Sequence, residues 1–178
     1  MALLKVQASS PADQPTISME REFAAPPAAV FRAYTDPEAL TRWYGPDGFT
    51  ITMIAMDLRV GGLLRFIMHG PDGTDYSNRI QYNEIVPAAR LAYRHGSDVD
   101  DDPNVFEVVI TFAPIGAGHT LLKTHSTFAS IEARNAVMKF GAVELGMQTV
   151  PGAGLVQHVA IGLGGDGESV RDADALPG

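Results

Sequence analysis

Cysteine is absent from the 178 residues of this sequence. Its absence excludes a disulfide framework, thiol catalysis and zinc sites built from cysteine. The sequence also lacks an apolar run of the roughly 18 residues that a membrane-spanning helix needs. Its amino terminus lacks the basic and apolar regions of a secretory signal peptide. We therefore expect a cytoplasmic protein.

Charged residues are few, at 19% of the chain, and acidic ones predominate, so the formal net charge is −8. Such a surface repels phosphate backbones and anionic lipids, which argues against nucleic acid or membrane partners. Hydrophobic residues make up 46%, a proportion typical of globular proteins rather than disordered or membrane ones. Together with the length, this composition predicts one soluble domain with a substantial core.

The chain divides into three parts. Residues 1–15 are polar and show no sustained period, which predicts a flexible N-terminal arm. Residues 16–161 carry the periodic patterns of a folded domain. Residues 162–178, which begin with a glycine-rich run, are predicted to be a flexible C-terminal tail.

Two short helices are predicted after a first strand at 17–24. The first helix follows Pro26, and Pro27 suits its first turn because the missing N–H has no helical partner there. The second begins beyond Asp36, which can cap it with Pro37 at its first position, and runs through Trp43.

Strands and turns are predicted for residues 49–128. Leu64, Phe66 and Met68 alternate with other side chains, which indicates a strand with one apolar face. A sheet that is apolar on one face needs a cover. Residues 130–149 can supply it, because Ser130 is a good N-cap and an apolar stripe follows at helical spacing.

Short motifs in a fixed order support this prediction of a sheet covered by helices. They are PAAVFRA at 27–33, PEAL at 37–40 with Trp43, DLRVGG at 57–62, EIVP at 84–87 before Arg90-Leu91, and STFAS at 126–130 leading into EAR at 132–134. Over roughly residues 17–149 the sequence resembles the AHSA-type branch of the START-like SRPBCC superfamily, named for activators of a heat-shock chaperone ATPase. The resemblance implies an α+β helix-grip fold, in which a curved antiparallel sheet, two short helices and a long C-terminal helix enclose an apolar cavity.

One departure from the family pattern concerns the final helix. Pro151, Gly152 and Gly154 fall where the family continues an unbroken apolar stripe. Proline removes a backbone donor and glycine favours non-helical torsions, so we predict an interruption at residues 150–154. Residues 155–161 then correspond to displaced final turns.

A set of mostly apolar and aromatic residues is expected to line the cavity. The candidate ligand-binding residues are Trp43, Phe66, Met68, Tyr82, Tyr93, Phe112, Met138, Phe140 and Glu144. Aromatic rings supply apolar contact and tyrosine hydroxyls supply orienting hydrogen bonds. For each of these residues ordinary core packing is the alternative, and for Glu144 it is a solvent-facing position on the helix.

No catalytic set can be assembled from the sequence. The five histidines show no metal-type spacing, so we expect no metal and no cofactor. His69 and His95 could serve as general bases, but the sequence places no partner beside either. His125 is predicted to lie on the surface. Arg134 is assigned to a solvated helix face, and the acidic residues 98–102 to a solvated connection.

Three functions stay open at this point. The favoured one is noncatalytic or weakly catalytic binding of a small apolar or aromatic molecule in the cavity. An enzyme of the polyketide cyclase or dehydratase kind would instead need a convergent polar set, such as Tyr82 with Glu144 or a histidine. A chaperone-interacting module, as the family name suggests, would place its function on an exposed surface. A homodimer is left open.

Overall fold

One antiparallel sheet forms the body of the computed structural model, which describes residues 6–45 and 48–138. Its eight strands lie in the order β1-β2-β8-β7-β6-β5-β4-β3. Their bounds are β1 Val6–Ser9, β2 Thr16–Phe23, β3 Thr50–Met56, β4 Leu63–His69, β5 Asp75–Val86, β6 Arg90–Ser97, β7 Phe106–Ile115 and β8 His119–Thr127. Every neighbouring pair is antiparallel. The antiparallel sheet of the predicted fold class is therefore present.

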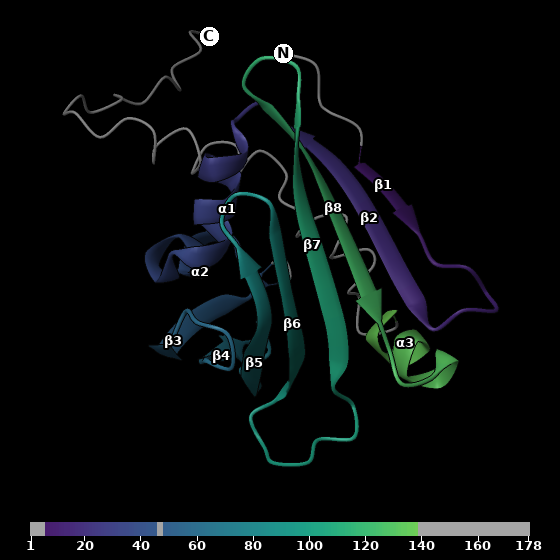
Figure 1. The fold of residues 1–178 in the computed structure, drawn as a ribbon. Coiled ribbons are helices and arrows are strands. Elements are labelled where there is room, and N and C mark those ends of the chain that lie inside the picture. Colours follow the sequence, from purple (N-terminus) through teal and green to yellow (C-terminus); the bar gives the residue numbers. More distant parts are fainter. Residues whose placement is uncertain (1–5, 46–47, 139–178) are drawn as a thin grey trace, which may run out of the picture.

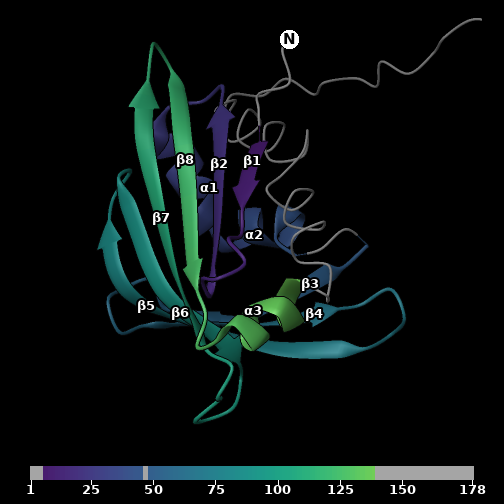
Figure 2. The same cartoon turned by 90° about the vertical axis from the view of Figure 1, so that its right-hand side faces the viewer.

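Three helices lie on one side of the curved sheet (Figures 1 and 2). They are α1 Pro27–Thr35, α2 Pro37–Trp43 and α3 Ile131–Val137. We call the sheet face toward α1 and α2 the inner face. Its central side chains are almost fully buried, as at Phe66, Tyr82 and Phe112. The two-residue period predicted for residues 64–68 is confirmed, because Leu64 and Phe66 are buried and Arg65 is exposed.

Both short helices begin where the sequence predicts. Pro27 occupies the first turn of α1. The Asp36 carboxylate accepts hydrogen bonds from the backbone N–H groups of Glu38 (2.9 Å) and Ala39 (3.1 Å), and so caps α2. The indole Nε1 of Trp43 donates to the carbonyl of Ala33 at 3.0 Å. This bond ties the end of α2 to α1 and holds both helices against the sheet.

The DLRVGG motif forms the tight connection between β3 and β4. Gly61 has a φ of 79°, a conformation that favours glycine. At Gly62 a Cβ atom would lie 2.1 Å from the carbonyl oxygen of Asp57, so only glycine fits. Arg59 Nε also donates to Asp57 Oδ2 at 2.7 Å. These contacts give the motif a structural role in the turn between β3 and β4.

The N-terminal segment differs from the prediction. Part of the expected flexible arm, residues 6–9, forms β1 and pairs with β2 from Val6 opposite Arg21 to Ser9 opposite Ser18. The sequence carried no signal for this strand because a short edge strand is held by its backbone ladder and needs no periodic apolar side chains.

Arg134 also differs from the prediction of a solvated position. It is 5% exposed, and its guanidinium donates to the backbone carbonyls of Pro11 and Gln14 in the β1–β2 connection. A helix residue thus becomes buried because a distant turn folds over it. This contact joins α3 to the N-terminal end of the sheet.

The predicted C-terminal helix is described only at its start. Ser130 is its N-cap, since Ser130 Oγ accepts from the N–H of Ala133 at 3.0 Å. The remainder of the predicted helix, the predicted interruption at 150–154 and the predicted tail at 162–178 lie outside the described residues. Among the described residues, no helix combines the length and apolar character needed to cross a membrane.

Replacing Arg134 with Met should lower the free energy of unfolding by about 1–2 kcal/mol, because two backbone carbonyls lose their donor. Urea denaturation measures the change. The control is Ala136→Gln on the exposed side of α3, which should alter stability by less than about 0.5 kcal/mol. Equal effects of the two substitutions would contradict the proposed role of Arg134.

Candidate functional site

A continuous group of aromatic rings fills the space between the inner face and the two short helices. Tyr34 contacts Trp43 edge-on with ring centroids 4.7 Å apart, and Trp43 contacts Tyr44 at 5.4 Å. Tyr44 in turn lies 5.5 Å from Phe66. On the sheet, Tyr82 and Tyr93 are paired across β5 and β6, with their rings 6.4 Å apart. These edge-to-face contacts are the favoured geometry for aromatic pairs.

Four tyrosines of this group, Tyr34, Tyr44, Tyr82 and Tyr93, bring their hydroxyls into one another's electrostatic reach. Burial is the main reason that the pKa of each is raised, and at Tyr44 it rises to about 12 although a hydrogen bond with Tyr93 acts in the opposite direction. The phenols are therefore neutral at physiological pH. A neutral phenol can both donate and accept a hydrogen bond.

A buried cation lies beside these tyrosines. Arg21 on β2 is 7% exposed, and its guanidinium carbon lies 5.0 Å from the ring centroid of Phe23. Burial lowers the pKa of Arg21, and the neighbouring Tyr34 acts in the opposite direction. Sequence reasoning missed Arg21, although the alternation of Ile17, Met19, Arg21 and Phe23 places its side chain on the apolar face.

His95 forms a second polar position on the inner face. Its Nε2 lies 3.0 Å from Asn78 Oδ1, while Asn78 Nδ2 donates to the carbonyl of Tyr76 at 2.8 Å. The imidazole lies near the rings of Phe66 (6.0 Å) and Phe106 (5.0 Å). Burial lowers the pKa of His95 to about 4, with Asp102 acting in the opposite direction. His95 is therefore neutral at physiological pH.

The β3–β4 end of the inner face is apolar and only partly buried. Ile51 lies opposite Met68, and Met53 lies opposite Phe66. Ile51, Met53 and Met68 all pack against the core while keeping some exposure. Methionine adapts its shape to what it contacts, so this end of the face can accommodate different apolar surfaces.

Six of the predicted ligand-binding residues lie in or against one buried cluster. Phe66, Tyr82, Tyr93 and Phe112 belong to it, and Met68 and Trp43 pack against it. Phe112 also lies 5.4 Å from the ring of Phe31 on α1, and Trp43 joins the two short helices.

Three predicted residues remain from the candidate set. Met138 accepts a hydrogen bond from Ser10 Oγ at 3.4 Å, near the β1–β2 connection. Phe140 and Glu144 lie outside the described residues. Sequence reasoning missed Tyr34 and Tyr44, because a tyrosine on or after a short helix carries no signal of where its hydroxyl lies.

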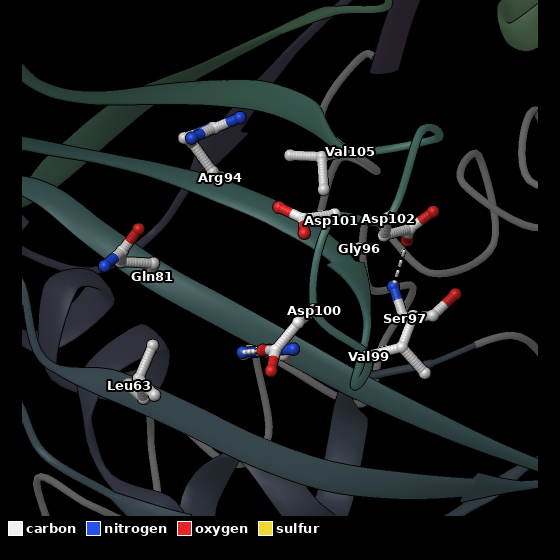
Figure 3. A pocket seen from close by; sticks show the side chains of 11 residues that line it. Leu63, Gln81, Arg94, Gly96, Ser97, Val99, Asp100, Asp101, Asp102 and Val105 are labelled. Carbon is white, nitrogen blue, oxygen red and sulfur yellow. Dashed lines mark hydrogen bonds and ion pairs between the residues drawn. The ribbon is translucent and has the colours of Figure 1, made fainter.

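A hollow of ≈ 390 Å³ opens on the outer face of the sheet, opposite the side of the predicted cavity. Leu63, Gln81 and Arg94 form its wall on neighbouring strands, and the acidic loop forms the other side (Figure 3). These side chains alternate with buried inner-face residues such as Leu64 and Tyr82, so they point away from the core.

The acidic loop is more than the solvated connection that the sequence suggested. Asp98 forms ion pairs with Arg65 at 2.6 Å and with Arg79 at 3.3 Å. Asp102 accepts from the backbone N–H groups of Ser97 (2.6 Å) and Asn104 (2.9 Å). Burial raises the pKa of Asp102, but these hydrogen bonds outweigh it, and the net pKa is below its ordinary value. The hollow thus results from a loop folded back and fastened to the sheet.

Surface histidines have local partners. His125 is exposed, as predicted, and its Nδ1 lies 2.8 Å from Ser18 Oγ. His69 lies between Thr52 Oγ1 (2.8 Å) and Asp75 Oδ1 (2.6 Å). Within residues 6–45 and 48–138, no three histidine or carboxylate side chains gather in a way that could hold a metal ion.

The curved antiparallel sheet with helices on its inner side is the architecture of the AHSA/SRPBCC class. Residues 24–159 match the model of the family "Activator of Hsp90 ATPase homolog 1-like protein", and the chain belongs to that family. The resemblance seen in the sequence is therefore confirmed. No curated protein matches the sequence significantly.

Solved structures share this fold. Protein Ms6760 from Mycobacterium smegmatis is 28% identical with a TM-score of 0.74, covering 89% of this chain and 98% of that one. Protein CV1439 from Chromobacterium violaceum is 28% identical with a TM-score of 0.65, covering 82% and 96%. A protein from Arthrobacter aurescens is 23% identical with a TM-score of 0.78, covering 87% and 91%.

The low pKa of His95 predicts a loss of stability in acid. In the folded protein the pKa of His95 is about 4, whereas a histidine in an unfolded chain has a pKa near 6.5. Between these two pH values the unfolded state therefore binds more protons than the folded state. Stability from neutral His95 is present above pH 6.5 and falls as the pH drops toward 4. The difference in unfolding free energy, His95→Phe minus wild type, should rise by roughly 2–3 kcal/mol from pH 7.5 to pH 4.5. Denaturant titrations at both pH values measure it, and a constant difference would contradict the prediction.

Proposed function

We propose that this protein binds a small aromatic or apolar molecule against the inner face of its sheet. The observation that carries the proposal is the convergence of four tyrosines, from α1, from the residue after α2, and from β5 and β6, in a mainly apolar interior. Ligand sites in proteins are mainly apolar, with a few convergent polar groups that orient the ligand. The interior of this fold has that composition.

The protonation of the tyrosines favours binding over catalysis. A phenol whose pKa is raised by burial, as at Tyr82, is a weak acid and a poor source of a nucleophile at neutral pH. It can still donate a hydrogen bond to a ligand oxygen. A cyclase or dehydratase, the alternative from another class, would need a group that exchanges protons near neutral pH, and the neutral His95 with a pKa of about 4 does not supply it.

The partly buried β3–β4 end supports access from outside. Met53, Met68 and Ile51 cover the side of the aromatic cluster next to Phe66 without being fully buried. Flexible thioether side chains can shift to admit an apolar group at small energetic cost. We therefore place the approach to the site at this end of the sheet.

Thermal shift with small aromatic and fatty probes tests the proposal. A ligand at a hundred times its dissociation constant stabilises the folded state by about 2.7 kcal/mol, which should raise Tm by roughly 5–10 °C for a domain of this size. Probes include naphthalene derivatives and medium-chain fatty acids. If no aromatic or fatty probe shifts Tm, the proposal fails.

Two substitutions locate the site. Met68→Trp adds bulk to the inner face beside Phe66 and should abolish the shift for every probe, at some loss of stability. The control is Ile54→Trp on the same end of the sheet, where Ile54 is 49% exposed, and it should leave the shift intact. Tyr82→Phe removes one hydroxyl and should weaken only probes with a polar group, by about 1 kcal/mol. Equal shifts in the Met68 and Ile54 variants would contradict an inner-face site.

A further inference from the structure

We infer that the ligand of this interior carries a hydroxyl group, of the phenolic kind, that donates a hydrogen bond to Nδ1 of His95. The inference rests on the proposed function and adds the ligand's chemical class. It is argued from the arrangement of His95, Asn78 and the phenylalanine rings around them.

The Asn78 side chain fixes which imidazole nitrogen carries the proton. Asn78 Nδ2 donates to the carbonyl of Tyr76 at 2.8 Å, so the amide is oriented with its nitrogen toward that carbonyl. Its Oδ1 therefore faces His95 and can only accept. Because Oδ1 lies 3.0 Å from Nε2, the hydrogen must sit on Nε2. The neutral imidazole is held as the Nε2–H tautomer, and its Nδ1 carries a lone pair.

This lone pair has no hydrogen-bond partner among the described residues. There His95 bonds Asn78, lies near the rings of Phe66 and Phe106, and is within electrostatic reach of the Asp102 carboxylate. As a whole residue His95 is half-buried on the inner face. A ligand group that reaches Nδ1 of His95 should therefore find a hydrogen-bond acceptor that has no donor of its own. The register supports this location, since His95 lies opposite Phe106 on β7 and next to Ile80 on β5, both inner-face residues.

The direction of the hydrogen bond determines which functional group the ligand must carry. A hydroxyl can donate to Nδ1, whereas an ether, a ketone or a carboxylate would place lone pair against lone pair. A site built around such a polar group rejects analogues that lack the matching partner. The aromatic surroundings of Phe66 and Phe106 favour a ring attached to that hydroxyl. A phenol satisfies both conditions.

Three matched probes separate these effects, namely 2-naphthol, 2-methoxynaphthalene and naphthalene. They share the same ring system, while only the first can donate through oxygen. Dissociation constants are measured by titration calorimetry at pH 7.5 with the full chain. The variants are His95→Phe, which keeps an aromatic ring but removes the acceptor, and His69→Phe as a control at a histidine bonded to Thr52 and Asp75.

The expected result is that wild type and His69→Phe bind 2-naphthol about tenfold more tightly than the methyl ether, a factor that one hydrogen bond of about 1.4 kcal/mol provides. In His95→Phe the two dissociation constants should become about equal, while naphthalene binds as tightly as it does to wild type. Circular dichroism confirms that the variant is folded. A Tyr82→Phe variant serves as a second check, since it should weaken 2-naphthol and its methyl ether alike and so leave the preference between them in place.

Two outcomes overturn the inference, and they differ in what they mean. If wild type binds the three probes equally, or if His95→Phe keeps the naphthol preference, the assignment to His95 is wrong while binding in the interior stands. If none of the three probes binds wild type, and fatty probes also fail to shift Tm, both the inference and the proposed function are wrong.

Discussion

The pairing of β5 with β6 determines what the inner face presents. Tyr82 lies opposite Tyr93, and a bulge between Tyr82 and Glu84 inserts one extra residue into β5. Because side chains alternate with a period of two, this extra residue lets both Tyr82 and Ile85 face the core. Glu84 then turns outward and bonds Arg90 at 2.7 Å. Without the bulge, every side chain on one side of it would change face.

Burial sets the protonation states of the ionisable side chains on the inner face. The inner face carries tyrosines and a histidine that a solvated sheet would hold near their ordinary pKa values. The tyrosines have raised pKa values and His95 has a lowered one, mainly because burial disfavours their charged forms. Every one of these groups is therefore neutral at physiological pH. Neutral donors and acceptors in an apolar interior suit the orientation of an uncharged ligand.

The outer face is organised by ion pairs instead. Asp98 bonds both Arg65 and Arg79 and fastens the β6–β7 loop to the sheet. At Gly96 a Cβ atom would lie 2.7 Å from a Val105 methyl group, so the loop approaches the strand closely only because glycine is there. The resulting hollow is open and lined by both charged and apolar residues, and two of them, Arg79 and Asp102, hold the loop to the sheet.

The sequence by itself determined the family, the two short helices and the alternation of the central strands, because proline placement, the Asp36 cap of α2 and a two-residue period are local properties of the chain. Only the tertiary structure decided that Arg134 is buried, since its backbone partners Pro11 and Gln14 lie more than a hundred residues away in the chain. It also decided that residues 6–9 form a strand, since that strand is held by its backbone ladder with β2. The candidate site, too, was partly predictable from the sequence and partly decided by the tertiary structure. The pattern of the strands predicted that Phe66, Tyr82 and Tyr93 line the interior. The convergence of Tyr34 and Tyr44 on them, and the tautomer of His95, follow from packing between elements that no local pattern relates.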